Sequence, residues 1–421
     1  MQSAVGSTPI HSRLKSNQLR CAMYNDKTAD ACRHLIERIF VVDDITEGGH
    51  EDKYLYRFRG HLRTLDSQQA YDDLAKALKP HNITPLFRKE NDQQIILLVE
   101  GVVQPSKSNG WINLGLFVLT IISVMVTGAM YGLNVPFTDD PVQTMLNIIQ
   151  GGWPFAISII AILGAHESGH YLMGRRYGIQ VSLPYFIPFP LSPLGTLGAF
   201  INMKEIPRNR RQLLDIGLAG PLAGIVVAIP VLYIGLKLSS LDALSATVPV
   251  GQYLQMEGNS LLYLVMKYLT FGRLLPEPVN FGPSGPVLYW IRYFFTGQPF
   301  PHGGLDVMLH PVAWAGWAGL LVTALNLIPA GQLDGGHVIY VLLGKERTQK
   351  LRPVIIFLLL ALGFFWSGWW LWAAIIYFLG RYQAEPLDQI TELDTKRKWL
   401  AILAIVVFIL VFTPVPLIIV G

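Results

Sequence analysis

Apolar residues are spread unevenly along the 421-residue chain, and this unevenness divides it into two parts. Up to about residue 110 the chain is mixed and polar, and the periodicity between residues 53 and 100 is typical of a small soluble α/β unit. Beyond that point long apolar runs recur, and several reach about 18 residues, the length that an α-helix needs to cross a bilayer. The pattern predicts an α-helical polytopic membrane protein with a small N-terminal soluble α/β domain.

The polar part is expected to contain a tail and one domain. We expect residues 1–52 to form an N-terminal tail, partly disordered, and residues 53–103 to form the α/β domain, followed by a short polar linker. Asp66 can cap a helix that Pro80 ends. Period-two alternation predicts three strands around this helix, at residues 54–58, 83–89 and 93–99. We expect a hairpin turn at Asn91 and Asp92 to join the last two.

Lys and Arg residues divide the apolar part, because they are costly in the bilayer core and collect on its cytoplasmic side. Between residues 111 and 421 we expect about seven spans, two of them short helices that turn near Ser367 and Gly368. Arg175 and Arg176 follow the second span, which predicts that its end and the α/β domain are cytoplasmic. The expected spans cover residues 114–133, 154–172, 213–236, 312–329, 353–380 as the two short helices, and 400–419.

Two segments between the spans have a different character. Residues 180–203 are apolar but contain four prolines and two glycines, which excludes a straight spanning helix and predicts a re-entrant β-hairpin or loop. Residues 237–310 form a long mixed segment with few basic residues, as expected on the non-cytoplasmic side.

Composition agrees with a membrane protein. The chain is 51% hydrophobic and only 15% charged, which excludes an ordinary soluble enzyme. The net charge of +4 is explained by basic cytoplasmic loops, so we expect no nucleic-acid partner. The two cysteines, Cys21 and Cys32, do not have the spacing of a metal site.

The second span ends in a metal-binding pattern, His166-Glu167-Ser168-Gly169-His170. Histidines four positions apart project from one face of a helix and can bind a single Zn²⁺, the expected cofactor. Glu167 lies beside them as a candidate general base for a metal-bound water. Charged and imidazole side chains are costly to bury in a membrane, so they mark functional sites by default. The competing interpretation is a polar cavity or an interfacial packing role.

A catalytic zinc needs a third protein ligand and one open position. Asp334 is the best candidate, because it follows the fourth span at the membrane depth where the second span ends. Its competing role is to cap the next short helix. Asn326 is a candidate hydrogen-bond donor to an oxyanion, or else a bridge between helices. His337 is a weaker candidate, favoured as a neighbour of the site over a ligand.

The order of three motifs resembles the site-2 proteases. These are the His166 to His170 pattern, the Gly220-Pro221-Leu222-Ala223-Gly224 segment, and the segment from Asn326 through Pro329 to Asp334-Gly335, within residues 150–345. The resemblance implies cleavage of transmembrane protein substrates near the cytosolic face, with zinc held by His166, His170 and Asp334 and with Glu167 as base. Gly60-His61-Leu62-Arg63 is similar to the Gly-Asn-Leu-Arg motif of the chloroplast EGY-type branch, with His61 in place of asparagine.

We expect the segment after Pro193 to present a strand edge to an unwound substrate by β-augmentation. The expected substrate-binding residues are Gly195, Thr196, Leu197, Gly198 and Ala199. The alternative is a re-entrant plug without substrate contact. We find neither a secretory signal nor a plastid-targeting extension in residues 1–25. The expected location is therefore the plasma or thylakoid membrane of a bacterium, with a cyanobacterium preferred, in contact with membrane lipid.

Two other classes of function compete with this interpretation. In a zinc or ion transporter, intramembrane His and Asp residues mark an ion path. A catalytically silent membrane chaperone would bind membrane proteins without cutting them. The intact histidine pair with Glu167 and Asp334 favours the protease, since a scaffold needs none of these residues.

Overall fold

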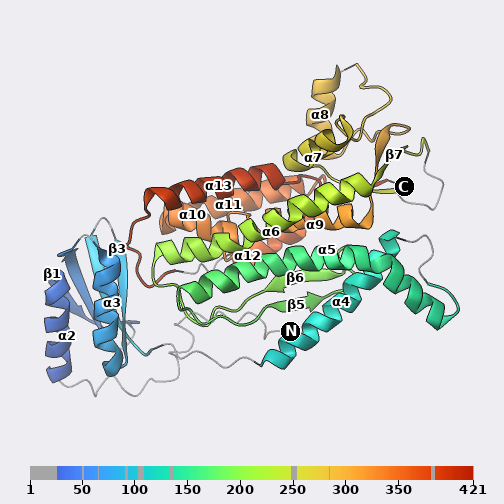
Figure 1. Cartoon of the computed structure of the whole chain (residues 1–421). Helices are drawn as coiled ribbons and strands as arrows, with labels where there is room; N and C mark the ends of the chain where they lie inside the picture. The colour runs from blue at the N-terminus through green and yellow to red at the C-terminus, as the bar shows by residue number, and fades with distance from the viewer. Residues whose placement is uncertain are drawn as a thin grey trace.

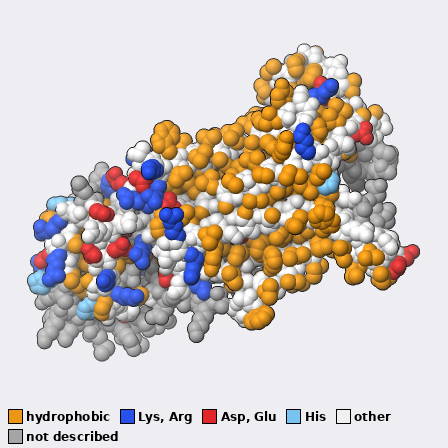
Figure 2. Space-filling view, in the orientation of Figure 1, with side chains coloured by type: hydrophobic (Ala, Val, Ile, Leu, Met, Phe, Trp, Pro, Cys, Tyr) orange, Lys and Arg blue, Asp and Glu red, His pale blue; other side chains and the backbone are white. Residues whose placement is uncertain are grey.

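The computed structural model describes residues 26–420, except residues 50–51, 65, 91–92, 103–108, 133–136, 248–253, 284 and 381–384. It is mostly helical, with an α/β domain at one end of a long helical body (Figure 1). Hydrophobic side chains cover the visible face of the helical body, whereas charged side chains gather on the α/β domain and where it joins that body (Figure 2). This division matches the two parts expected from the hydrophobic pattern.

The α/β domain has a four-stranded antiparallel sheet with strand order β1-β2-β4-β3. Its helices share one core with the sheet, in which Ile36, Phe40, Leu74 and Phe87 are buried. The Asp66 carboxylate accepts hydrogen bonds from the Gln68 and Gln69 amides, which confirms the predicted helix cap. The elements are α2 (Asp26–Ile39), β1 (Phe40–Glu47), β2 (Tyr56–Leu62), α3 (Ser67–Leu78), the 3₁₀ turn η3 (Lys79–His81), β3 (Ile83–Glu90) and β4 (Gln93–Glu100).

The predicted N-terminal tail is wrong for the part that the structure describes. Residues 26–47 form α2 and β1, and β1 pairs with β2 along its length. Cys32, Ile36 and Phe40 recur at a spacing of four and are almost fully buried, so this segment is needed to close the core. Residues 1–25, and the expected hairpin turn at residues 91–92, lie outside the described residues.

Within the described part of the chain, three helices are long and apolar enough to cross a membrane: α4 (Gly110–Gly132), α5 (Pro141–Arg176) and α6 (Arg210–Leu238). They lie close together, and α6 also packs against α9 (Pro311–Asn326). A Cβ atom at Gly152 in α5 would lie 2.1 Å from the Met125 carbonyl oxygen of α4. Glycine at this crossing therefore allows the two backbones to touch.

The remaining helices differ from the expectation of seven spans. Residues 353–380 do contain two helices, α11 (Lys345–Leu362) and α12 (Gly368–Leu379), as predicted. However, α12 and α13 (Thr395–Val411) have only 12 and 17 residues, and α9 has 16. The expected last span fails after residue 411, because Pro414 and Pro416 cannot continue a helix. The chain instead forms β10 (Leu417–Val420), which pairs with β8 (Leu254–Glu257).

Residues 180–203 contain a short antiparallel hairpin of β5 (Tyr185–Pro188) and β6 (Thr196–Phe200), which lies beside α4 and α5 (Figure 1). The Ser123 hydroxyl on α4 donates to the Gly195 carbonyl at 2.5 Å. The Asn113 amide, also on α4, donates to the Leu183 carbonyl at 2.8 Å. Polar groups of the first long helix thus hold this non-helical backbone.

An insertion between α6 and α9 projects from the end of the helical body far from the α/β domain (Figure 1). It contains β8, β7 (Ser240–Ala243), α7 (Leu261–Phe271), α8 (Gly285–Thr296) and β9 (Leu305–Met308), and β7 pairs with β9. Lys267 is fully buried there, with its Nζ 3.1 Å from Glu257 Oε1 and 3.7 Å from Asp306 Oδ1. Burial of a lysine together with two carboxyl groups requires this mutual contact.

Candidate metal centre

His166 and His170 lie one helical turn apart on α5, near its C-terminal end, and both are buried. Their Nε2 atoms are 3.2 Å apart. Asp334, the first residue of α10 (Asp334–Leu343), brings its Oδ2 to 3.4 Å from His166 Nε2 and 3.3 Å from His170 Nε2. The three predicted ligands therefore converge, with their donor atoms all within 4.8 Å of one another.

The hydrogen bonds around His170 suit a metal ligand. Its Nδ1 lies 2.7 Å from the Ile216 carbonyl oxygen on α6. A carbonyl can only accept, so Nδ1 carries the hydrogen and Nε2 presents its lone pair toward His166 and Asp334. Two imidazole nitrogens and one carboxylate oxygen are a usual donor set for catalytic zinc. The residues present therefore fit the predicted cofactor.

The Gly220-Pro221-Leu222-Ala223-Gly224 segment of α6 passes directly against the two histidines. A Cβ atom at Gly220 would lie 2.0 Å from His170 Nε2, and one at Gly224 would lie 3.3 Å from His166 Nδ1. Small residues four apart, such as Gly220 and Gly224, allow close helix packing. The structure shows that Gly220 also makes room for the imidazole of His170.

Glu167 and Asn326 flank the three ligands. Glu167 is 5% exposed, and its carboxylate accepts a hydrogen bond from the backbone amide of Ile201, just after β6. Asn326, the last residue of α9, has its Nδ2 3.2 Å from His166 Nε2. The structure thus brings the predicted base and the predicted oxyanion donor to the same place as the ligands.

The competing role of Asp334 as a helix cap is wrong. Leu333 occupies the N-cap of α10, and no side chain caps this helix end. His337, one turn further along α10, is 6% exposed and lies beside Gly217 of α6. Its Nδ1 is buried and has no hydrogen-bond partner among the described residues.

These residues surround a cavity of about 200 Å³. Ala199 contributes to its wall, together with Phe200 and Ile201. The other four predicted substrate-binding residues lie outside this wall. Gly195 is held against α4, and Thr196 is buried with its hydroxyl on the Ile187 carbonyl. Leu197 is 63% exposed, and the Gly198 amide donates to the Thr196 hydroxyl. Sequence reasoning missed the carbonyl of Ile216 and the amide of Ile201, because a backbone group leaves no signal in the sequence.

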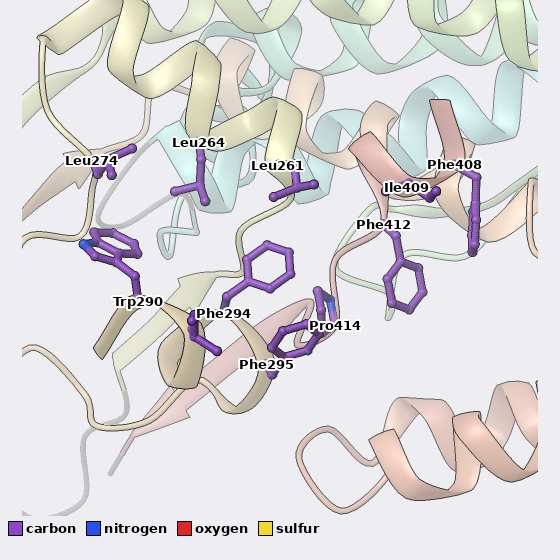
Figure 3. Close-up of a pocket in the computed structure, with 11 residues that line it drawn as sticks. Leu261, Leu264, Leu274, Trp290, Phe294, Phe295, Phe408, Ile409, Phe412 and Pro414 are labelled. Atoms are coloured by element: carbon purple, nitrogen blue, oxygen red, sulfur yellow. The ribbon is translucent and has the colours of Figure 1, made fainter. Parts of the chain in front are cut away.

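A larger hollow of about 490 Å³ lies away from this centre, between α7, α8 and α13 (Figure 3). Leucine, isoleucine, phenylalanine, tryptophan and proline side chains form its wall, among them Leu264, Trp290 and Phe412. The side chains of its wall include no titratable group, so we assign the catalytic site to the smaller polar cavity.

Comparisons with known proteins find similarity to peptidases. The family model described as peptidase family M50 matches residues 154–366. The chain is similar to the protein named "Probable zinc metalloprotease EGY2, chloroplastic" of Oryza sativa subsp. indica, at 27% identity over 85% of this chain and 61% of that protein. It is also 31% identical to "Probable zinc metalloprotease EGY1, chloroplastic" of Arabidopsis thaliana, over 76% of this chain and 56% of that protein.

The chain thus spans about six tenths or less of the length of these curated relatives. No solved structure matches it.

Proposed function

The chain belongs to peptidase family M50, and from this membership we propose that it is an intramembrane zinc metalloprotease that cleaves transmembrane helices of membrane proteins near the cytosolic face. The observation that carries the proposal is the convergence of His166, His170 and Asp334, with Glu167 beside them, in a buried cavity between α5, α6 and α10. The names of the relatives as zinc metalloproteases support the choice of metal.

In this proposal each residue has one role. Zinc bound by His166, His170 and Asp334 would polarise the scissile carbonyl and acidify the attacking water. Glu167 takes the proton from that water and passes it to the leaving amide nitrogen. The side-chain amide of Asn326 donates a hydrogen bond to the oxyanion. Ile216 holds His170 in the required tautomer through the Nδ1 hydrogen.

The substrate must present an extended segment, because the hydrogen bonds of a helix protect its peptide bonds. Strand β6 pairs with β5 along only one edge, and its C-terminal end reaches the cavity at Ala199. We propose that the β5–β6 hairpin is re-entrant and that the unwound substrate adds to β6 along Gly195 to Ala199. The hydrogen bonds from α4 that hold this hairpin support the proposal.

The expected setting is the plasma or thylakoid membrane of a bacterium, with a cyanobacterium preferred, and with the α/β domain on the cytoplasmic side. The chloroplast relatives and the three helices able to span a membrane support a membrane of this kind. The basic residues near the ends of α5 and α6 that are closest to the α/β domain support the orientation. Membrane lipid and membrane-protein substrates are the implied partners.

The competing functions gain no support. The relatives are named as proteases, and neither an ion transporter nor a silent chaperone requires a glutamate placed beside three metal ligands. The proposed function is tested with purified protein in detergent, using fluorescein-labelled casein as an unfolded probe. We expect Glu167→Gln to retain zinc but to abolish cleavage. Equal cleavage by wild type and Glu167→Gln would refute the mechanism.

A further inference from the structure

His337 is a buried side chain of the cavity to which the mechanism above gives no role. It follows Asp334 by three residues on α10, so both side chains project from the same face of that helix. The cavity wall includes His337 together with His166, His170 and Asn326. A polar side chain this deeply buried needs a reason to be there, because burying its ring nitrogens without partners is costly.

The two ring nitrogens of His337 have different surroundings. Nδ1 is buried without a partner among the described residues. A buried N–H without an acceptor is rarer in proteins than an acceptor without a donor. The favoured neutral tautomer therefore leaves Nδ1 bare and places the hydrogen on Nε2. Because His337 lines the cavity and Nδ1 is its fully buried ring nitrogen, we assign Nε2 as the nitrogen that faces the cavity.

His337 is also not placed as a fourth metal ligand. Among the described residues, the group whose ligand atoms converge consists of His166, His170 and Asp334, and His337 is not part of it. The Nε2 atoms of His166 and His170 lie 3.4 Å and 3.3 Å from the Asp334 carboxylate. The ring carbon Cδ2 of His337 would lie 3.5 Å from a Cβ at Gly217, so the imidazole packs against α6 at the side of the ligand group.

We propose that His337 is a further catalytic residue, whose Nε2–H donates a hydrogen bond to the oxyanion that develops on the scissile carbonyl. It acts there together with the Asn326 amide, which approaches the ligands from the end of α9. Two donors from two different elements would flank the reacting carbonyl, as preorganised donors do in other peptide-cleaving sites. This inference rests on the proposed function.

Three variants of the full-length protein in detergent test the proposal, with zinc content and casein cleavage as separate measurements. His337→Phe removes the donor but retains a flat ring. We expect it to keep zinc at the wild-type level and to lower kcat about 100-fold with little change in KM, the usual loss for one oxyanion donor. His337→Gln places an amide N–H near the position of Nε2, so it should recover at least about tenfold of that loss.

Val338→Ala is the matched control. Val338 is equally buried in α10 but lies outside the cavity wall, so this variant loses packing without losing a donor. We expect its kcat to stay within about twofold of wild type, even though its unfolding temperature falls because a buried side chain is shortened. If Val338→Ala lost as much activity as His337→Phe, the effect of His337 would be structural and the proposal would be overturned.

The remaining outcomes separate this inference from the proposed function. Loss of zinc in His337→Phe would make His337 part of the metal site, and unchanged kcat would show that it takes no part; either result overturns the inference. Glu167→Gln is measured in parallel. If wild type and Glu167→Gln cleave casein equally, the proposed function itself fails. If Glu167→Gln is inactive while His337→Phe is fully active, only the role of His337 is excluded.

Discussion

At Gly220 the absence of a single carbon atom leaves room for the metal centre. A Cβ there would lie 2.0 Å from His170 Nε2, the atom that faces the other ligands. The ring cannot turn away freely, because its Nδ1 is bound to the Ile216 carbonyl. We expect Gly220→Ala to weaken zinc affinity about 10–100-fold, the range seen when ligand positioning is disturbed. Zinc titration of the purified protein measures it.

Gly164 supplies the control for that substitution. It also lies within a long apolar helix, but a Cβ at this position meets no atom within 4 Å. Gly164→Ala should therefore leave zinc affinity unchanged. A zinc affinity in Gly220→Ala equal to that in Gly164→Ala would mean that the close contact at Gly220 is unimportant.

Sequence reasoning at the residue scale succeeds where spacing along the chain decides the geometry. Two histidines four apart on a helix must share a face, and Asp334 could be placed by matching the ends of two spans. It fails where the partner is a backbone group on another helix, as with Ile216, or where burial leaves an atom unpaired, as with Nδ1 of His337. Such features arise only when the helices pack.

At the scale of elements, the segment between α12 and α13 connects the α/β domain to the helical body. The Phe87 amide of β3 donates to the Leu387 carbonyl, and the Gln389 amide donates to the Phe87 carbonyl. The Asp388 amide donates to the Arg208 carbonyl at 2.6 Å, just before α6. The segment therefore pairs with both the sheet and the chain that enters a long helix.

Asp388 holds this segment in shape. It is 1% exposed, and its carboxylate accepts hydrogen bonds from the Ile390 amide, the Thr391 amide and the Ser67 hydroxyl. Asp388→Ala would leave the Ile390 and Thr391 amides without this acceptor, at a cost of about 1–3 kcal/mol. We expect faster hydrogen exchange at the amides of Phe87 and Gln389, measured by mass spectrometry.

An exposed acid in the same region is the control. Asp72 pairs with Arg208 at 3.2 Å on the surface, so Asp72→Ala should change stability by less than about 1 kcal/mol and leave that exchange unaltered. Unchanged exchange in Asp388→Ala as well would show that the segment is held by its backbone hydrogen bonds alone.

The predicted elements were most accurate where the period was clear and the ends carried signals. Helix α3 begins after the Asp66 cap and ends before Pro80, as expected. The last span was predicted too long because residues 412–419 are mostly apolar, although Leu417 to Val420 pair with β8 instead of continuing the helix. Hydropathy cannot distinguish a buried strand from the end of a spanning helix.

At the scale of the whole molecule, the insertion between α6 and α9 should respond to pH. Burial raises the pKa of Asp306 to about 6, and Lys267 opposes this shift only in part. The folded state therefore favours the protonated carboxyl, whose ordinary pKa is about 4. Protonation of Asp306 therefore stabilises the folded state. This contribution is complete below about pH 4 and is lost as the pH rises through about 6.

Thermal unfolding at pH 5 and pH 7.5 measures this effect. We expect wild type to unfold at a higher temperature at pH 5, and Asp306→Asn, which imitates the protonated carboxyl, to reduce that difference. If the unfolding temperature changed with pH in the same way in wild type and Asp306→Asn, Asp306 would be excluded as the source of the pH dependence.

The division of the chain into a polar domain and a membrane part follows from composition, but the way these parts join does not. The contact uses residues 207–209 and 387–389, which are distant in sequence from the α/β domain. Residues 26–47 were missed for a related reason, since the core that buries them is completed by strands further along the chain. In both cases long-range packing decides the outcome.

The most direct test of the central claim is the position of the cut in a membrane-embedded substrate. Wild type in liposomes is incubated with a peptide whose apolar segment of about 20 leucine and alanine residues contains one Asn-Gly pair and is flanked by lysines. Mass spectrometry of the products should show a cut inside the apolar segment with wild type and none with Glu167→Gln. Cuts confined to the lysine flanks, or cuts that persist in Glu167→Gln, would contradict the account.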